Sequence, residues 1–124
     1  MARRTVTILV VDDEPDVCEM IELGLSMQGY RVVTAEGGER ALTLMNDEAI
    51  DLLITDLKMP GLSGVETAVE MRRVSPALPV IVVTGYIAPE MLSDCEALGN
   101  VELIRKPFAF ETLAEAVENA VGRP

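Results

Sequence analysis

The chain has 124 residues, enough for one domain, and 49% of them are hydrophobic, so a proper core can form. Acidic residues outnumber basic ones by 21 to 10, and the net charge of −11 argues against direct contact with nucleic acid or a membrane surface. The absence of histidine excludes every mechanism that needs an imidazole on this chain, and Cys18 and Cys95 are expected to be small apolar helix residues in a reducing cytosol.

The first two elements are predicted to be a buried strand and an amphipathic helix. Residues 6–11 form an apolar run that only Thr7 interrupts, which is typical of a strand covered on both faces. Apolar residues then recur at helical spacing over 17–25. Pro15 suits the first turn of this helix, and Gly29 is placed to end it in a left-handed conformation.

The same alternation of strand and helix continues to the end of the chain. Further strands are predicted at 31–34, 52–55, 80–84 and 101–104. Further helices are predicted after Gly37-Gly38, at 65–74, at about 88–98 and over an apolar stripe at 113–121. Residues 59–64 are dense in turn formers and are expected to be a loop. This (βα)₅ pattern predicts an α/β fold, a doubly wound parallel sheet in a single domain over 1–124 with its core at about 5–121.

Acidic residues follow two of the predicted strands, at the sheet edge where open α/β folds bind ligands. Asp12, Asp13 and Glu14 come after the first strand, and Asp56 comes after the third. Converging carboxylates repel each other unless a cation joins them, and oxygen ligands alone suit a hard cation such as Mg²⁺. Taken singly, the first three acids fit the start of a helix before Pro15 equally well, and Asp56 could be a turn residue.

Two further polar residues belong to the same predicted edge. Thr84 ends the fourth strand, and Lys106 follows the fifth. A lysine can neutralise a phosphoryl oxygen and a threonine hydroxyl can donate to one, so the combined set predicts a site for phosphoryl transfer. Thr84 alone is better explained as a β-former and Lys106 could be a surface residue, but chance would scatter such residues over both edges.

Four segments resemble the receiver domain of two-component response regulators, and the likeness covers nearly the whole chain. They are VVDDEP at 10–15, TDLKMPGLSG at 55–64, VTG at 83–85 and KPF at 106–108. The resemblance implies a flavodoxin-like fold with strand order 2-1-3-4-5 and a cis peptide bond between Lys106 and Pro107. It also implies a phosphoacceptor, which assists its own phosphorylation and dephosphorylation, rather than a turnover enzyme.

The resemblance assigns a role to each candidate residue. Asp56 is implied as the phosphoacceptor, with Thr84 and Lys106 in contact with the phosphoryl group. Mg²⁺ is the implied cofactor. Its implied ligands are Asp13 and Asp56 directly, Asp12 through a water molecule, and Lys58 through its backbone carbonyl.

The resemblance also implies the partners. A histidine kinase or a histidine phosphotransfer protein would present a phosphohistidine, and phosphorylation would switch the docking of a downstream protein. We expect a monomer or a weak dimer that contacts neither nucleic acid nor membrane. Cytoplasm is the expected location, because no secretory signal opens the chain and its first apolar run is too short to span a bilayer.

Several alternatives remain open or are disfavoured by single positions. A haloacid-dehalogenase-type phosphatase needs a second aspartate where Lys58 stands, and a dinucleotide-binding fold needs a glycine-rich turn where Asp12 and Asp13 stand. A pseudo-receiver, which binds a partner without being phosphorylated, is the main rival, although this chain retains the acidic residues and the lysine. The receiver could also be a segment of a hybrid histidine kinase or of a longer regulator.

Two positions bear on the switch that phosphorylation would operate. Leu103 stands where the family has an aromatic residue, three before the lysine, and leucine cannot reproduce an aromatic rotamer signal. We therefore expect Thr84 and the loop after the fourth strand to move, with weaker effects on the last strand. Lys58 and Tyr86 lie two residues after Asp56 and Thr84, positions that flank the route of the hydrolytic water in the family, although Tyr86 is equally well explained as a half-exposed loop residue.

Overall fold

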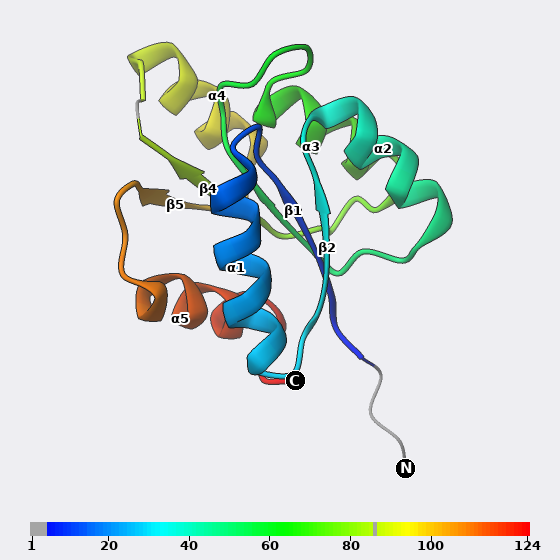
Figure 1. The fold of residues 1–124 in the computed structure, drawn as a ribbon. Coiled ribbons are helices and arrows are strands. Elements are labelled where there is room, and N and C mark those ends of the chain that lie inside the picture. Colours follow the sequence, from blue (N-terminus) through cyan, green and yellow to red (C-terminus); the bar gives the residue numbers. More distant parts are fainter. Residues whose placement is uncertain (1–4, 86) are drawn as a thin grey trace.

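Strands and helices alternate five times along the chain, as the sequence predicts. The computed structural model describes residues 5–85 and 87–124. The strands are β1 (Thr7–Val11), β2 (Arg31–Ala35), β3 (Leu52–Thr55), β4 (Val80–Thr84) and β5 (Val101–Arg105). The helices are α1 (Pro15–Met27), α2 (Gly38–Asp47), α3 (Gly64–Val74), α4 (Pro89–Leu98) and α5 (Phe110–Val121). All strand pairs are parallel and their order is β2-β1-β3-β4-β5, which confirms the flavodoxin-like, doubly wound fold (Figure 1).

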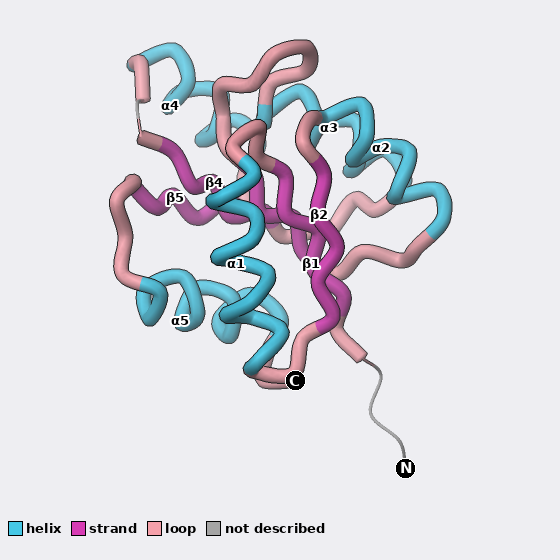
Figure 2. Tube along the Cα trace, in the orientation of Figure 1, coloured by secondary structure: helices cyan, strands magenta, loops and turns pink. Residues whose placement is uncertain are grey.

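The sheet forms a central layer with helices on both faces. Helices α1 and α5 cover one face, and α2, α3 and α4 cover the other (Figure 2). Successive strand residues point to opposite faces. In β1, Ile8 and Val10 therefore pack against α1 and α5, while Leu9 and Val11 pack on the side of α2, α3 and α4. This double burial explains why β1 is apolar at nearly every position.

The two edge strands differ from the central ones. Every residue of β1, β3 and β4 is buried, whereas β2 and β5 combine buried, partly buried and exposed positions. Edge strands have a neighbour on one side only, so their side chains are covered less completely. Leu103 of β5 is only partly buried and packs at the margin of the core on the side of α2, α3 and α4.

Local sequence signals fix several helix ends. Pro15 begins α1, and Gly29, with a φ of +103°, follows the last turn in the left-handed conformation that the sequence predicts. Helix α3 begins with a capping box in which Ser63 and Glu66 exchange side-chain and backbone hydrogen bonds. Both cysteines lie on helices, as predicted: Cys18 is on α1 and Cys95 on α4, and both are buried and free.

No helix within residues 5–85 and 87–124 has the length and the apolar character that a membrane crossing requires. The Lys106–Pro107 peptide bond is cis, as the resemblance implied.

The strand order reverses between β1 and β3, because β2 lies beyond β1 and β4 lies beyond β3. The carboxyl ends of β1 and β3 therefore meet at the point where this class of fold binds ligands.

One arginine ties three segments together on the side of α3 and α4. The guanidinium of Arg72, near the end of α3, donates to the carbonyls of Leu78 at 2.9 Å, Leu98 at 2.7 Å, Gly99 at 2.8 Å and Asn100 at 3.2 Å. These carbonyls belong to the turn before β4, to the last residue of α4 and to the turn between α4 and β5. A single side chain thus fixes the two turns that lead into β4 and β5. These turns lie at the amino ends of the strands, opposite the edge that binds ligands.

Replacing Arg72 by methionine should lower the free energy of unfolding by about 2 kcal/mol. Methionine keeps the apolar stem but leaves the bonded carbonyls without their charged donor, and hydrogen bonds to charged groups are worth about 1.5–3 kcal/mol. Urea unfolding followed by circular dichroism measures the change. The control is Arg73→Met, because Arg73 is exposed and its ion pair within the described part of the chain is with Glu70, one turn away. Equal losses for the two variants would contradict a structural role for the Arg72 contacts.

Candidate functional site

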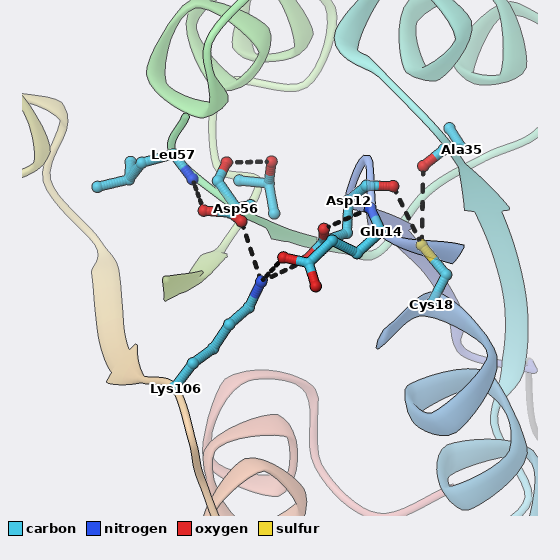
Figure 3. A network of polar contacts seen from close by, with 8 residues as sticks. Asp12, Glu14, Cys18, Ala35, Asp56, Leu57 and Lys106 are labelled. Carbon is cyan, nitrogen blue, oxygen red and sulfur yellow. Dashed lines mark hydrogen bonds and ion pairs between the residues drawn. The ribbon is translucent and has the colours of Figure 1, made fainter. Parts of the chain in front are cut away.

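Residues from three strand ends meet at the carboxyl edge of the sheet. Asp12 follows β1, Asp56 follows β3 and Lys106 follows β5 (Figure 3). The Lys106 Nζ lies 2.9 Å from Asp12 Oδ2 and 3.0 Å from Asp56 Oδ2. In the sequence, Lys106 is 94 positions from Asp12 and 50 positions from Asp56. The predicted convergence of acids and amine at one sheet edge is therefore present in the fold.

A third carboxylate completes an all-oxygen cluster. Ligand oxygens of Asp12, Asp13 and Asp56 all lie within 4.8 Å of one another. Asp12 and Asp56 are buried, with 2% and 8% of their surface exposed, whereas Asp13 faces solvent. Hard divalent cations prefer oxygen ligands, and Mg²⁺ commonly uses one or two carboxylates together with water. The number, chemistry and spacing of these oxygens therefore fit a single Mg²⁺ ion.

The charges of the cluster are only partly compensated within the protein. Burial raises the pKa of Asp12, and this effect prevails over hydrogen bonds from the Glu14 amide at 2.9 Å and from Lys106. Burial by itself would lower the pKa of Lys106, but its hydrogen bonds and charge interactions with Asp12 and Asp56 raise it instead. Lys106 therefore stays protonated at neutral pH. The Lys106 ammonium pairs with Asp12 and Asp56, and with Glu14 at a longer distance of 3.6 Å, while the Asp13 carboxylate adds a further negative charge beside Asp12 and Asp56.

The Asp56 carboxylate is held at both of its oxygens. The backbone amide of Leu57 donates to Oδ1 at 2.6 Å, while Lys106 binds Oδ2. The Thr55 hydroxyl donates to the Asp56 carbonyl at 2.8 Å. Gly64, the first residue of α3, approaches that carbonyl so closely that a Cβ there would overlap it. Side-chain rotation of Asp56 is thus restricted before any ligand arrives.

The remaining sequence candidates lie around this cluster. Thr84 is buried at the end of β4, and its carbonyl accepts the Lys106 amide at 2.9 Å. Lys58 is exposed and, with Asp13, lines a surface cavity of about 440 Å³ that also touches Met59 and Pro60. Tyr86 lies outside the described residues. Lys58 and Asp13 therefore border the same surface cavity beside the acidic cluster.

Cys18 lies next to the site, against the backbone of Asp12. Its thiol donates to the Asp12 carbonyl at 3.4 Å and more weakly to the Ala35 carbonyl at 3.9 Å (Figure 3). Burial and the nearby Asp12 charge raise the pKa of Cys18 to about 11, so the thiol is protonated at neutral pH. It links α1 to the ends of β1 and β2 and has no nucleophilic character there.

Sequence reasoning missed the Leu57 amide and the close approach of Gly64. A backbone donor carries no signature, because any residue except proline would supply it. Gly64 lies in the turn-rich segment that the sequence singles out, but its role depends on how near α3 comes to β3. That distance is a property of the packed fold and has no counterpart in the local sequence.

Comparison with known proteins places this geometry in a family. The profile described as "Response regulator receiver domain" matches residues 8–118. The chain is 33% identical over 122 residues to the transcriptional regulatory protein GlrR of Escherichia coli, covering 98% of this chain and 27% of that protein. It is 38% identical over 106 residues to the uncharacterized transcriptional regulatory protein YrkP of Bacillus subtilis, covering 86% of this chain and 45% of that protein. The chain thus spans between about a quarter and a half of these curated relatives.

Solved structures give the same result. The chemotaxis protein CheY4 of Vibrio cholerae superimposes with a TM-score of 0.88 at 29% identity, covering 94% of this chain and 99% of that one. The response regulator TrrA of Thermotoga maritima, determined in complex with Mg²⁺ and BeF, gives a TM-score of 0.82 at 38% identity over 94% of this chain and 99% of that one. The chain belongs to the response regulator receiver domain family, the phosphoacceptor modules of two-component signalling.

Proposed function

We propose that Asp56 is the phosphoacceptor of this receiver domain, with Lys106 and Thr84 as the residues that contact the phosphoryl group. The observation that carries the proposal is the bridge that Lys106 forms between Asp12 and Asp56, at 2.9 and 3.0 Å, beside the Asp13 carboxylate. An acceptor carboxylate, a fixed cation and an acidic cluster at one sheet edge are the parts that phosphoryl transfer needs.

The chemistry follows from these groups. A carboxylate oxygen of Asp56 forms a bond to phosphorus while the bond from phosphorus to the donor nitrogen breaks, and the donor imidazole keeps the electron pair. The Lys106 ammonium would neutralise charge on the phosphoryl oxygens, and the Thr84 hydroxyl would donate to one of them. The Leu57 amide holds the orientation of Asp56 throughout, because it binds Oδ1 at 2.6 Å. Hydrolysis of the resulting acyl phosphate by water restores Asp56.

The acidic cluster would hold the Mg²⁺ ion. The proposed ligands are Asp13 and Asp56 directly, Asp12 through a water molecule and Lys58 through its backbone carbonyl. When bound, Mg²⁺ supplies positive charge that neutralises the phosphoryl oxygens and lessens the repulsion among the three carboxylates. The solved TrrA structure in complex with Mg²⁺ and BeF supports this assignment, because it comes from a relative of similar fold.

The proposed donor is a phosphohistidine on a histidine kinase or a histidine phosphotransfer protein, and the proposed output is altered docking of a downstream protein. The net charge of −11 favours protein partners over nucleic acid and anionic membranes. The proposed location is the cytoplasm, which is typical of receiver domains. Because curated relatives are longer, the chain could act alone or as the receiver segment of a longer regulator or hybrid kinase. We expect it to be a monomer or a weak dimer.

Incubation with acetyl phosphate and Mg²⁺ should add the mass of one phosphoryl group to the intact protein. The gain should disappear in Asp56→Asn, because an amide cannot form the acyl phosphate, and should reverse on standing as water hydrolyses it. Intact-mass spectrometry measures both, and Asp51→Asn, which alters an aspartate at the opposite end of β3, is the control. A folded wild-type protein that gains no mass would instead identify a pseudo-receiver.

A further inference from the structure

The loop between β3 and α3 passes close to the start of α2. This loop, residues 57–63, follows Asp56 and contains Lys58, whose carbonyl is a proposed Mg²⁺ ligand. Helices α2 and α3 lie side by side in Figure 1. Gly38, the first residue of α2, approaches Thr67 of α3 and Leu62 of the loop so closely that a Cβ there would overlap both side chains. The loop therefore packs directly against the beginning of α2.

Glu39, the next residue of α2, reaches into the loop. Its Oε1 accepts a hydrogen bond from the Leu62 amide at 3.2 Å. Gly61 has a φ of +79°, in the left-handed region that favours glycine, and a Cβ there would lie 2.5 Å from the same Oε1. The glycine thus allows the backbone turn and also leaves room for the carboxylate to lie against it.

This contact is the hydrogen-bonded tether of the loop's central part. The two ends of the loop are fixed by other bonds, from the Gly64 amide to the Leu57 carbonyl at 2.8 Å and through the capping box at Ser63. Between residues 58 and 62, the Glu39–Leu62 bond is the one hydrogen bond found among the described residues. Burial of the Met59 side chain gives an apolar anchor, which does not set the direction of the neighbouring carbonyls.

We propose that Glu39 is a positioning residue, which holds loop 57–63 so that the Lys58 carbonyl faces the Mg²⁺ site. The inference rests on the proposed function, because it takes that carbonyl as a ligand. Residues that orient metal ligands are commonly worth about 10–100-fold in affinity, and an exposed tether one step further away should be worth less. The alternative is that Glu39 only complements the dipole at the start of α2, which would affect helix stability and leave metal affinity unchanged.

The test is calorimetric titration of Mg²⁺ into the whole chain without a phosphodonor. Glu39→Ala should raise the Kd for Mg²⁺ by about three- to tenfold, because the loop loses its acceptor. Glu39→Gln should stay close to wild type, since its amide oxygen still accepts from Leu62. Glu36→Ala removes the same charge from the residues just before α2 and should also stay close to wild type. Hydrogen exchange at the Leu62 amide should be faster in metal-free Glu39→Ala and unchanged in Glu36→Ala.

The outcomes separate this inference from the proposed function. Wild-type Mg²⁺ affinity in Glu39→Ala would overturn the positioning role while leaving the proposed metal site intact. Equal weakening in Glu39→Gln and Glu39→Ala would attribute the effect to charge and would overturn it as well. If the wild-type protein itself binds no Mg²⁺, the proposed function fails and the inference fails with it.

Discussion

Lys106→Met should slow phosphorylation by acetyl phosphate by about 10²–10³-fold, the usual cost of removing one fixed donor from a developing anionic group. The Lys106 ammonium lies 3.0 Å from Asp56 Oδ2, and its raised pKa keeps it charged throughout the neutral range. Methionine retains the apolar stem, so the change removes the charge with little loss of packing. The rate of mass gain under limiting acetyl phosphate is the measurement.

The neighbouring Arg105 provides the matched control. It is exposed at the end of β5, and Arg105→Met makes the same change in net charge one residue away. A general effect of charge on the approach of the phosphodonor would slow both variants equally, whereas a fixed role at the site slows only Lys106→Met. Phosphorylation of Lys106→Met at the wild-type rate, in a protein with unchanged circular dichroism, would rule out the role we assign to this lysine.

Mg²⁺ at about a hundredfold excess over its Kd should raise the free energy of unfolding by about 2–3 kcal/mol, because it binds the folded protein and not the unfolded chain. The oxygens of Asp12, Asp13 and Asp56 lie within 4.8 Å of one another, and the Lys106 ammonium pairs with Asp12 and Asp56, so the three negative charges repel one another when no metal ion is bound. Asp13→Asn should therefore be more stable than wild type without Mg²⁺ and should lose most of the stabilisation with it. Urea unfolding with and without MgCl₂ measures both effects.

Two controls distinguish specific binding of Mg²⁺ from general screening of the carboxylate charges by salt. NaCl at matched ionic strength weakens repulsion between exposed carboxylates without occupying the site, so it should reproduce only a minor part of the Mg²⁺ effect. Asp94→Asn removes an exposed carboxylate from α4 and should respond to Mg²⁺ as the wild type does. If NaCl stabilised the protein as much as MgCl₂, or if Asp13→Asn kept the full response, the cluster would not be a specific metal site.

Leu103 stands where the family has an aromatic residue, and its place in the structure bears on how phosphorylation is transmitted. It lies on β5, is only partly buried and packs at the core margin on the side of α4. A leucine there has no hydroxyl to exchange between interior and solvent. Our expectation therefore stands that phosphorylation moves Thr84 and its loop more than it moves β5, and amide chemical shifts with a phosphoryl mimic measure the difference.

The sequence by itself determined the alternation of elements and the residues available at one sheet edge. A run of apolar, β-branched residues indicates a strand, and apolar residues at helical spacing indicate a helix. Both are local properties of the sequence, which is why β1 and α5 could be predicted from their own residues. Because all strands of a parallel sheet run in the same direction, their carboxyl ends lie at one edge, so Asp12, Asp56 and Lys106 were expected to converge. That expectation needed no knowledge of any single contact.

Only the tertiary structure decided which atoms meet. The Lys106 bridge between two aspartates, the Leu57 amide on Asp56, the Glu39 tether and the Arg72 contacts join residues distant in sequence or use backbone groups. It also decided how far the residues of the edge strands β2 and β5 are exposed. The physical reason is that periodicity records which face of an element is buried, whereas a hydrogen bond depends on how separate elements pack to within a few tenths of an ångström.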